Sequence, residues 1–146
     1  MTENIVRSVT PDDIEWGIAL AGQHYSQEFD ETAVRAWAHQ RLSHPEIVFL
    51  RTDHAFGAAN LAMRYSAPTR PQAYLTLLYA EKGVSGFELL RLINGLKEWA
   101  LSKGATKFWL GDITGHDMGP LISRIGGVFA GSTYVVDLAG DGRRFN

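Results

Sequence analysis

With 146 residues, 45% of them hydrophobic, the chain can bury one core but not two comfortable ones, so we expect a single domain over residues 1–146. Its formal net charge of −2 argues against a nucleic-acid partner, because such a partner requires a basic face. The chain contains no cysteine, which excludes disulfide bonds, thiolate metal sites and a cysteine nucleophile.

The first third of the chain predicts a strand followed by two helices. Residues 5–9 are rich in β-branched side chains and predict the strand. Thr10 and Pro11 mark a helix start, with Thr10 as N-cap and Pro11 at the first helical position, ahead of two acids. A loop is expected over residues 26–29, after which Asp30 can cap the second helix.

Two strands and a loop are expected next. Residues 46–51 are dense in strand-forming side chains. Residues 55–63 are rich in alanine and glycine, and such small residues would allow another element or a ligand to come close. Residues 66–71 contain two prolines and predict a surface loop.

The middle of the chain carries its strongest pattern. The apolar run 73–80 predicts a buried strand, and the polar residues 81–86 predict a turn after it. Apolar residues then recur at the spacing of one helical face. Ser85 and Glu88 form an S-x-x-E capping box that predicts the helix start, and Gly104 is expected to end the helix. A strand, a glycine-bearing turn and a helix N-terminus can together bind an anion.

The last third predicts three strands, a short helix and a flexible tail. The strands are expected at residues 105–110, 128–130 and 133–138, and the helix at 120–125. Residues 139–146 are expected to fray. The order β-α-α-β-β-β-α-β-α-β-β predicts an α+β fold with one mixed, mostly antiparallel sheet flanked by helices. An edge strand near the C-terminus would also offer a contact for a homodimer.

Several functional classes find no support in the sequence. No apolar run reaches the roughly 18–20 residues that cross a bilayer, and the first residues lack the features of a signal peptide, so a cytoplasmic protein without a membrane partner is expected. The histidines show no HExxH or other ligand spacing, which predicts no metal. No G-x-S-x-G elbow is present, which disfavours a serine hydrolase.

The order of elements resembles that of the GCN5-related N-acetyltransferase (GNAT) superfamily over nearly the whole chain. Residues 83–90, Gly-Val-Ser-Gly-Phe-Glu-Leu-Leu, resemble the family's acetyl-CoA loop, in which glycines precede a helix that starts with paired leucines. The family signature is Gln or Arg, two residues, Gly, one residue, then Gly or Ala. Two alignments stay open, one with Glu81 first and Gly86 last, the other with Ala80 first and Gly83 as the first glycine.

The resemblance implies an acetyl-CoA-dependent N-acetyltransferase that moves the acetyl group directly to a primary amine of a small molecule or protein. In this family the central strand's backbone holds the thioester and pantetheine arm, and the amides after it hold the pyrophosphate. The implied cofactor-binding residues are Leu78, Tyr79, Ala80, Lys82, Gly83, Val84, Ser85, Gly86 and Phe87. The alternative is a non-catalytic module that keeps the fold and binds CoA or another protein.

The catalytic groups stay open in the sequence. In the family a base, often a carboxylate acting through water, takes the amine proton, and a tyrosine in the last helix often protonates the departing thiolate. Here the place of that tyrosine falls at Ile122 or Ser123, and Ser123 could only orient a water; Tyr79 and Tyr134 are the other phenols considered. The candidate bases are Glu28, His24, Asp112, His116 and Asp117.

We take Glu28, His116 and Ser123 as the predicted catalytic set. A general acid or base is worth about 10²–10⁴-fold, so the loss of one slows the reaction without abolishing it. The simpler explanation for Glu28 is a solvated polar loop, and for His116 a solvated side chain beside a helix cap.

Overall fold

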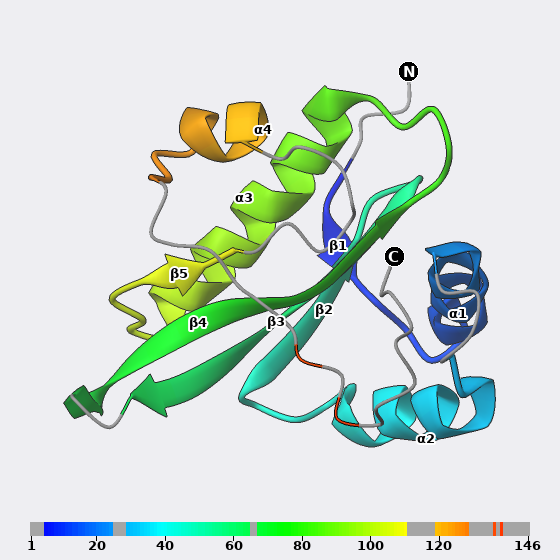
Figure 1. Ribbon diagram of the computed structural model, residues 1–146, viewed down its shortest axis with the longest axis horizontal. Coiled ribbons are helices and arrows are strands. Elements are labelled where there is room, and N and C mark those ends of the chain that lie inside the picture. The colour runs from blue at the N-terminus through cyan, green and yellow to red at the C-terminus, as the bar shows by residue number, and fades with distance from the viewer. Residues whose placement is uncertain are drawn as a thin grey trace.

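The chain folds into one mixed sheet with helices on both faces (Figure 1). The structure is a computed structural model and describes residues 5–24, 29–64, 67–110, 119–128, 136 and 138. The elements, in order, are β1 (Arg7–Ser8), α1 (Asp13–His24), α2 (Glu31–Arg41), β2 (Ile47–Arg51), β3 (Ala55–Arg64), β4 (Ala67–Ala80), α3 (Gly86–Ser102), β5 (Phe108–Trp109) and α4 (Gly119–Arg124). No helix within these ranges has the length and apolarity to cross a bilayer.

This order confirms the first nine predicted elements. The two predicted closing strands are not confirmed. Val128, Val136 and Leu138 lie outside any strand, and the other residues of the two segments fall outside the described residues.

The sheet follows the order of the chain. Strands β1, β2, β3 and β4 pair antiparallel with their neighbours, and β5 joins the far edge of β4 in parallel. The parallel pairing joins Ala73 to Phe108 and Tyr74 to Trp109. The predicted mixed, mostly antiparallel sheet is therefore confirmed.

Alternation along the strands divides the core between the two faces of the sheet. Phe49, Phe56 and Tyr79 pack toward α1 and α2, whereas Leu78 and Ala55 pack against α3 (Figure 1). Because successive strand side chains point to opposite faces, neighbours such as Leu78 and Tyr79 belong to different layers.

The predicted ends of α3 are present. The Ser85 hydroxyl accepts a hydrogen bond from the N–H of Glu88 at 3.1 Å. At the other end Gly104 has φ +80, the left-handed region that favours glycine. The N–H of Ala105 then donates to the carbonyl of Ala100 at 3.0 Å, which is the Schellman arrangement.

Helix α2 begins where the sequence indicates, whereas α1 begins at Asp13, two residues after the predicted first helical position, Pro11. The Asp30 carboxylate accepts from the N–H of Ala33 at 3.1 Å, as expected of an N-cap. At α1 the side-chain roles differ from the prediction. Here the Asp13 carboxylate accepts from both the N–H and the hydroxyl of Thr10, at 2.9 and 3.0 Å.

The predicted surface loop over residues 66–71 is wrong, because β4 already begins at Ala67. Proline lacks the N–H that a central strand must donate, so its presence favoured a loop. This part of β4 pairs with β3 on one side, and β5 joins the other edge only from Ala73. Pro71 is tolerated there because it accepts a bond from the N–H of Thr106, at 3.1 Å, and needs to donate none toward β5.

Candidate functional site

Strand β4 changes its surroundings halfway along its length. Ala58 pairs with Leu77 but Ala59 pairs with Leu75, so Thr76 is an extra residue that makes a β-bulge. The parallel pairing with β5 covers only Ala73 and Tyr74. Beyond the bulge, the described part of the chain adds no further strand to that edge. Such an edge can take an extended ligand along the backbone.

The predicted arm-binding residues lie in this second half of β4. Leu78 is only 1% exposed and packs toward α3, together with Ala80. Tyr79 is buried in the other layer, under α1 and α2. Their side chains therefore serve the two cores, and only the backbone of this segment lies along the strand edge, as the family resemblance expects.

The turn from β4 to α3 brings the predicted phosphate-binding residues to the surface. Lys82, Gly83, Ser85, Gly86 and Phe87 are all exposed. Gly83 has φ +85, and a Cβ added to it would meet no atom within 4 Å. A side chain is thus disfavoured at Gly83 by the backbone and not by crowding.

The first turn of α3 presents three consecutive amides. Among the described residues, no acceptor is found for the N–H groups of Ser85, Gly86 and Phe87. In a complete capping box the Glu88 carboxylate would accept from Ser85. These donors stand at the positive end of a 17-residue helix, where an anion such as a pyrophosphate is favoured.

The side chain of Glu88 turns away from the cap, so this half of the predicted capping box is wrong. Its Oε2 accepts from the Thr52 hydroxyl at 2.6 Å and from the N–H of His54 at 2.7 Å. Its Oε1 lies 3.0 Å from His54 Nδ1. Glu88 is 3% exposed, so a buried carboxylate ties the start of α3 to the turn between β2 and β3.

The same contacts set the charges of the pair. Burial acts to raise the pKa of Glu88, but the hydrogen bonds from Thr52 and His54 outweigh it and hold that pKa below its ordinary value. The hydrogen bond to Glu88 raises the pKa of His54. Glu88 is therefore an anion whose charge is locally compensated.

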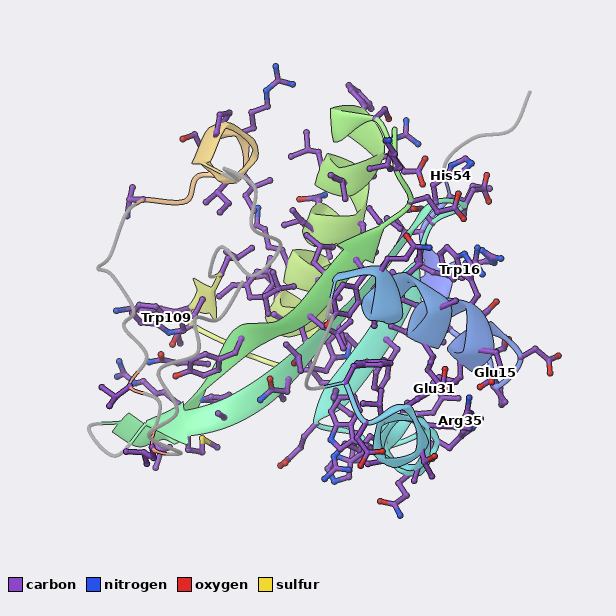
Figure 2. All side chains as sticks on the ribbon, turned by 45° about the vertical axis from the view of Figure 1, so that its right-hand side comes forward. Glu15, Trp16, Glu31, Arg35, His54 and Trp109 are labelled. Carbon is purple, nitrogen blue, oxygen red and sulfur yellow. The ribbon has the colours of Figure 1, made fainter. Side chains whose placement is uncertain are left out.

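A second set of contacts ties the turn to α1. The N–H of Glu81 donates to the carbonyl of His54 at 2.8 Å. The carboxylate of Glu81 accepts a hydrogen bond from Trp16 Nε1 at 3.0 Å. The Arg51 guanidinium lies 3.7 Å from the centre of the Trp16 ring and pairs with Asp13 at 2.8 Å. Figure 2 shows His54 and Trp16 at the end of the sheet where α3 begins.

Sequence reasoning missed this polar network, although one signal pointed to it. Glu88 lies four and eight residues before Leu92 and Leu96, on the buried stripe of the helix. A charged residue on such a stripe requires a partner, since an unpaired buried charge is costly. The partners Thr52 and His54 lie in the turn between β2 and β3, 36 and 34 residues before Glu88 in the sequence.

Of the three predicted catalytic residues, only Ser123 lies within the described part of the chain. Glu28 and His116 lie outside the described residues, as do Asp112 and Asp117, and His24 is the last residue of α1. Ser123 is exposed on α4, and no hydrogen bond from its hydroxyl to a described residue is found. The catalytic roles stay predictions.

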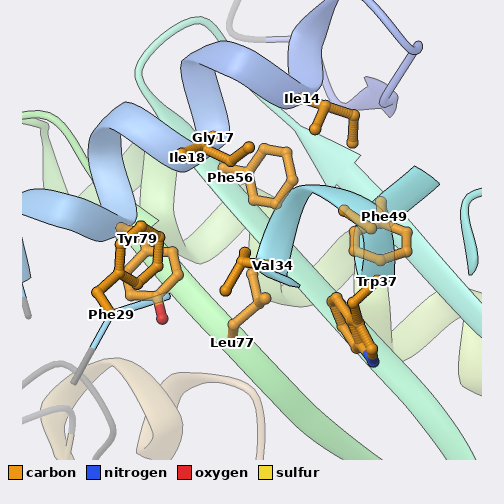
Figure 3. A pocket seen from close by; sticks show the side chains of 12 residues that line it. Ile14, Gly17, Ile18, Phe29, Val34, Trp37, Phe49, Phe56, Leu77 and Tyr79 are labelled. Atoms are coloured by element: carbon orange, nitrogen blue, oxygen red, sulfur yellow. The ribbon is translucent and has the colours of Figure 1, made fainter. Parts of the chain in front are cut away.

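A cavity of about 270 Å³ lies on the other face of the sheet, between α1, α2 and the strands (Figure 3). Strand residues Phe49, Phe56, Leu77 and Tyr79 form its floor, and the Trp37 ring meets Phe49 edge-on with the centroids 5.7 Å apart. None of the described residues that line it is charged. The others are Ile14, Gly17, Ile18, Ala21, Phe29, Val34 and Ala38.

This cavity is large for a packing defect. A closed, dry cavity costs roughly 24 cal/mol per Å³, which for 270 Å³ is about 6 kcal/mol as an upper limit. That is comparable with the whole stability of a domain, about 5–15 kcal/mol. Its volume lies just below the range of about 300–1,000 Å³ for ligand pockets, and its apolar and aromatic lining is of the kind that such pockets have.

Comparison with known proteins identifies the fold. No sequence profile of a known family matches the chain, and no curated protein matches it in sequence. Solved structures do match. Glucosamine-6-phosphate N-acetyltransferase from Arabidopsis thaliana superposes with a TM-score of 0.73 at 14% identity, over 92% of this chain and 97% of that chain. The chain has the GNAT acetyltransferase fold.

Two further GNAT-fold structures agree. A predicted acetyltransferase from Clostridium acetobutylicum, solved with acetyl-CoA, has a TM-score of 0.66 at 16% identity and covers 95% of this chain and 99% of that chain. An aminoglycoside 6'-N-acetyltransferase from Acinetobacter haemolyticus has a TM-score of 0.68 at 17% identity, over 91% and 96%. At these identities the likeness shows the GNAT fold and no activity.

The residues of this GNAT-fold chain fit a CoA phosphate. Three adjacent amides at Ser85, Gly86 and Phe87 have no described acceptor, and the space beside Gly83 is open. The side chain of Glu88, which could have occupied the first of these donors, is engaged elsewhere. The described residues hold no cluster of three or more metal-ligating side chains.

Proposed function

We propose that the protein is a divergent GNAT N-acetyltransferase that transfers an acetyl group from acetyl-CoA to a primary amine. The observation that carries the proposal is the open first turn of α3, placed directly after the free half of β4 in a GNAT fold. The pantetheine arm is assigned to the backbone of residues 78–80. The pyrophosphate is assigned to the amides of residues 85–87, since the N–H of Val84 already donates to the Glu81 carbonyl at 3.1 Å, and Lys82 adds a positive charge beside them.

The proposed reaction is direct transfer. Bound acetyl-CoA supplies an activated acyl carbon; the amine nitrogen attacks it, a C–N bond forms, the C–S bond breaks and the thiolate leaves. Glu28 or His116 is proposed to take the amine proton, directly or through a water, and a water that Ser123 orients is proposed to protonate the departing thiolate. The β4 edge and the helix start fix the position of the thioester, and such positioning accounts for a large share of catalysis.

A second function is favoured by the last helix. Ile122 and Ser123 occupy the place of the family's proton-donating tyrosine, and Ser123 is exposed on a helix of six residues. A GNAT-fold protein without that group could bind CoA and act as a binding or interaction module.

Calorimetry with acetyl-CoA and with CoA tests the shared part of both functions. We expect both ligands to bind. The absence of any heat of binding at millimolar ligand would refute the proposal. Release of free thiol with a panel of primary amines then separates the two. Release with any amine identifies a transferase, whereas CoA binding without release across the panel identifies the module.

A further inference from the structure

The cavity under α1 and α2 shares a strand with the proposed thioester position. Leu77 and Tyr79 contribute to its floor, and they flank Leu78 on β4. Leu78 itself faces the opposite layer, toward α3. A group bound at the edge of β4 near Leu78 is therefore one residue along the strand from the cavity floor.

The lining of the cavity is almost entirely hydrocarbon. Among the described residues that form it, only Trp37 and Tyr79 carry a polar side-chain atom, and none carries a charge. The sheet side is aromatic, with the Phe49 and Phe56 ring centroids 6.1 Å apart. A body bearing several ammonium groups would lose its hydration here without gaining a carboxylate partner among the described lining residues, which is strongly unfavourable.

The volume of the cavity further limits the size of the ligand that it can hold. An apolar protein cavity of about 150 Å³ is enough to hold benzene. At about 270 Å³ this one has room for a ring with a short chain, or for an aliphatic chain of similar volume. The small side chains of Ala21, Val34 and Ala38 on the two helices leave this space open.

We propose that the acceptor is a primary amine with an aromatic or aliphatic body, which the cavity holds while the amine stands at the edge of β4. This inference rests on the proposed function. It separates the chain from the aminoglycoside acetyltransferases that share its fold, since an aminoglycoside is a polycation. Burial of the apolar body in the cavity provides the binding energy. The buried body also positions the amine at the edge of β4, which by itself would not distinguish one amine from another.

Two variants of one helix test the cavity. Ala38→Leu adds three carbons at a residue that lines the cavity and is 6% exposed. Ala36→Leu makes the same change on the exposed face of α2 and serves as the matched control. Because the cavity has room for the larger side chain, Ala38→Leu should keep the melting temperature of the wild type. If it does not fold, Val34→Leu adds one carbon at another lining residue and replaces it.

The readout is calorimetric binding of 2-phenylethylamine, with glucosamine as a polar primary amine for comparison, to free and CoA-saturated protein. We expect 2-phenylethylamine to bind the wild type at least about tenfold tighter than glucosamine, and its Kd to rise at least about tenfold in Ala38→Leu while Ala36→Leu stays unchanged. Acetyl-CoA affinity should be equal in all three proteins.

Two results would overturn the inference. One is a preference of the wild type for glucosamine, and the other is equal affinity of Ala38→Leu and Ala36→Leu for 2-phenylethylamine. Failure of the proposed function looks different, because it appears as absent acetyl-CoA binding. The amine titration of the free protein then still decides which chemical class of ligand the cavity holds.

Discussion

The two faces of the sheet hold their parts of the candidate site by different physical means. At the end of the sheet where α3 begins, directed hydrogen bonds of 2.6–3.1 Å fix Glu88 and Glu81, and so fix the turn that carries the proposed phosphate site. On the α1 and α2 side, apolar and aromatic side chains line the cavity, and none of the described residues that line it is charged. In our proposal the first region recognises charge at fixed positions, and the second recognises shape and apolar surface.

This difference has consequences for mutation. Hydrogen-bonded groups fail when a partner is lost, because the remaining donors and acceptors stay buried and unpaired. An apolar cavity responds instead to volume, and a substitution that fits the space can even stabilise the fold. The following predictions separate these two behaviours.

The largest effect is expected for Gly86→Glu. Gly86 is exposed and its φ is not positive, so the helical backbone at this position accepts a side chain. The helix dipole also stabilises a negative charge in the first turn. Two like charges about 4 Å apart near a protein surface repel by about 4 kcal/mol. We therefore expect unchanged folding but a loss of acetyl-CoA affinity of at least about a hundredfold by calorimetry.

The matched control is Asn94→Glu, which adds the same charge at an exposed position of the same helix. Eight residues along a helix are about 12 Å, beyond the screening length of about 8 Å at physiological salt. Asn94→Glu should bind acetyl-CoA like the wild type. If Gly86→Glu does so too, the phosphate site is not at the start of α3.

The next effect is on stability. Glu88→Ala leaves the buried Thr52 hydroxyl and the His54 N–H without their acceptor. We expect the free energy of unfolding to fall by about 3 kcal/mol, measured by urea denaturation. The exposed Glu98 on the same helix is the control, and Glu98→Ala should change stability by less than about 0.5 kcal/mol. Equal losses in the two variants would show that the network does not hold the helix start.

A smaller effect tests the packed side with two glycines of α1. A Cβ on Gly17 would lie 2.9 Å from the ring of Phe56, which is 5% exposed, whereas a Cβ on Gly22 would have the Phe29 ring, at 4.0 Å, as its nearest neighbour among the described residues. Alanine in place of helical glycine gains about 1 kcal/mol, and overpacking costs about 1–3 kcal/mol. We therefore expect a higher melting temperature for Gly22→Ala and no increase for Gly17→Ala. An equal increase in both variants would mean that the Phe56 ring moves aside at no cost in stability.

The same contrast explains what could be predicted from the sequence. The α3 region is local: strand, turn and cap lie within residues 73–104, so periodicity, Ser85 and Gly104 predicted them correctly. The cavity unites residues from Ile14 to Tyr79, and no spacing rule reports the volume left between elements that far apart. The capping motif at Glu88 was predicted only in part. Ser85 accepts from the N–H of Glu88 as predicted, but the Glu88 carboxylate accepts from Thr52 and His54 in a distant turn and not from Ser85.

The loop predicted at residues 66–71 failed for a related reason. Proline is a local signal against a central strand, but whether a strand segment is central depends on its neighbours in the sheet. The segment acquires β5 only from Ala73 onward, which the sequence of the segment does not encode. Fold class and element order were accessible because they follow from many such segments together, whereas the assignment of each functional group depends on a single contact.

The smallest predicted effect is the pH dependence of the His54–Glu88 pair. The pKa of His54 is raised, so its contribution to stability is full below the ordinary value of 6.5 and is lost as pH rises through the higher folded pKa. The pKa of Glu88 is lowered, so its contribution is present above 4.5 and is lost as pH falls through the folded pKa. The pair therefore stabilises most between these two values.

A His54→Gln variant should reveal this window. We expect the difference in unfolding free energy between wild type and variant to shrink as pH rises above 6.5 and through the raised pKa of folded His54, because His54 then loses its proton. In a Glu88→Ala background the same substitution should leave the pH slope unchanged, because the partner that raises the pKa is gone. If the pH slope persists without Glu88, a group other than the His54–Glu88 pair causes it. In that case the start of α3 is held only by the uncharged hydrogen bonds that the Thr52 hydroxyl and the His54 N–H donate to Glu88.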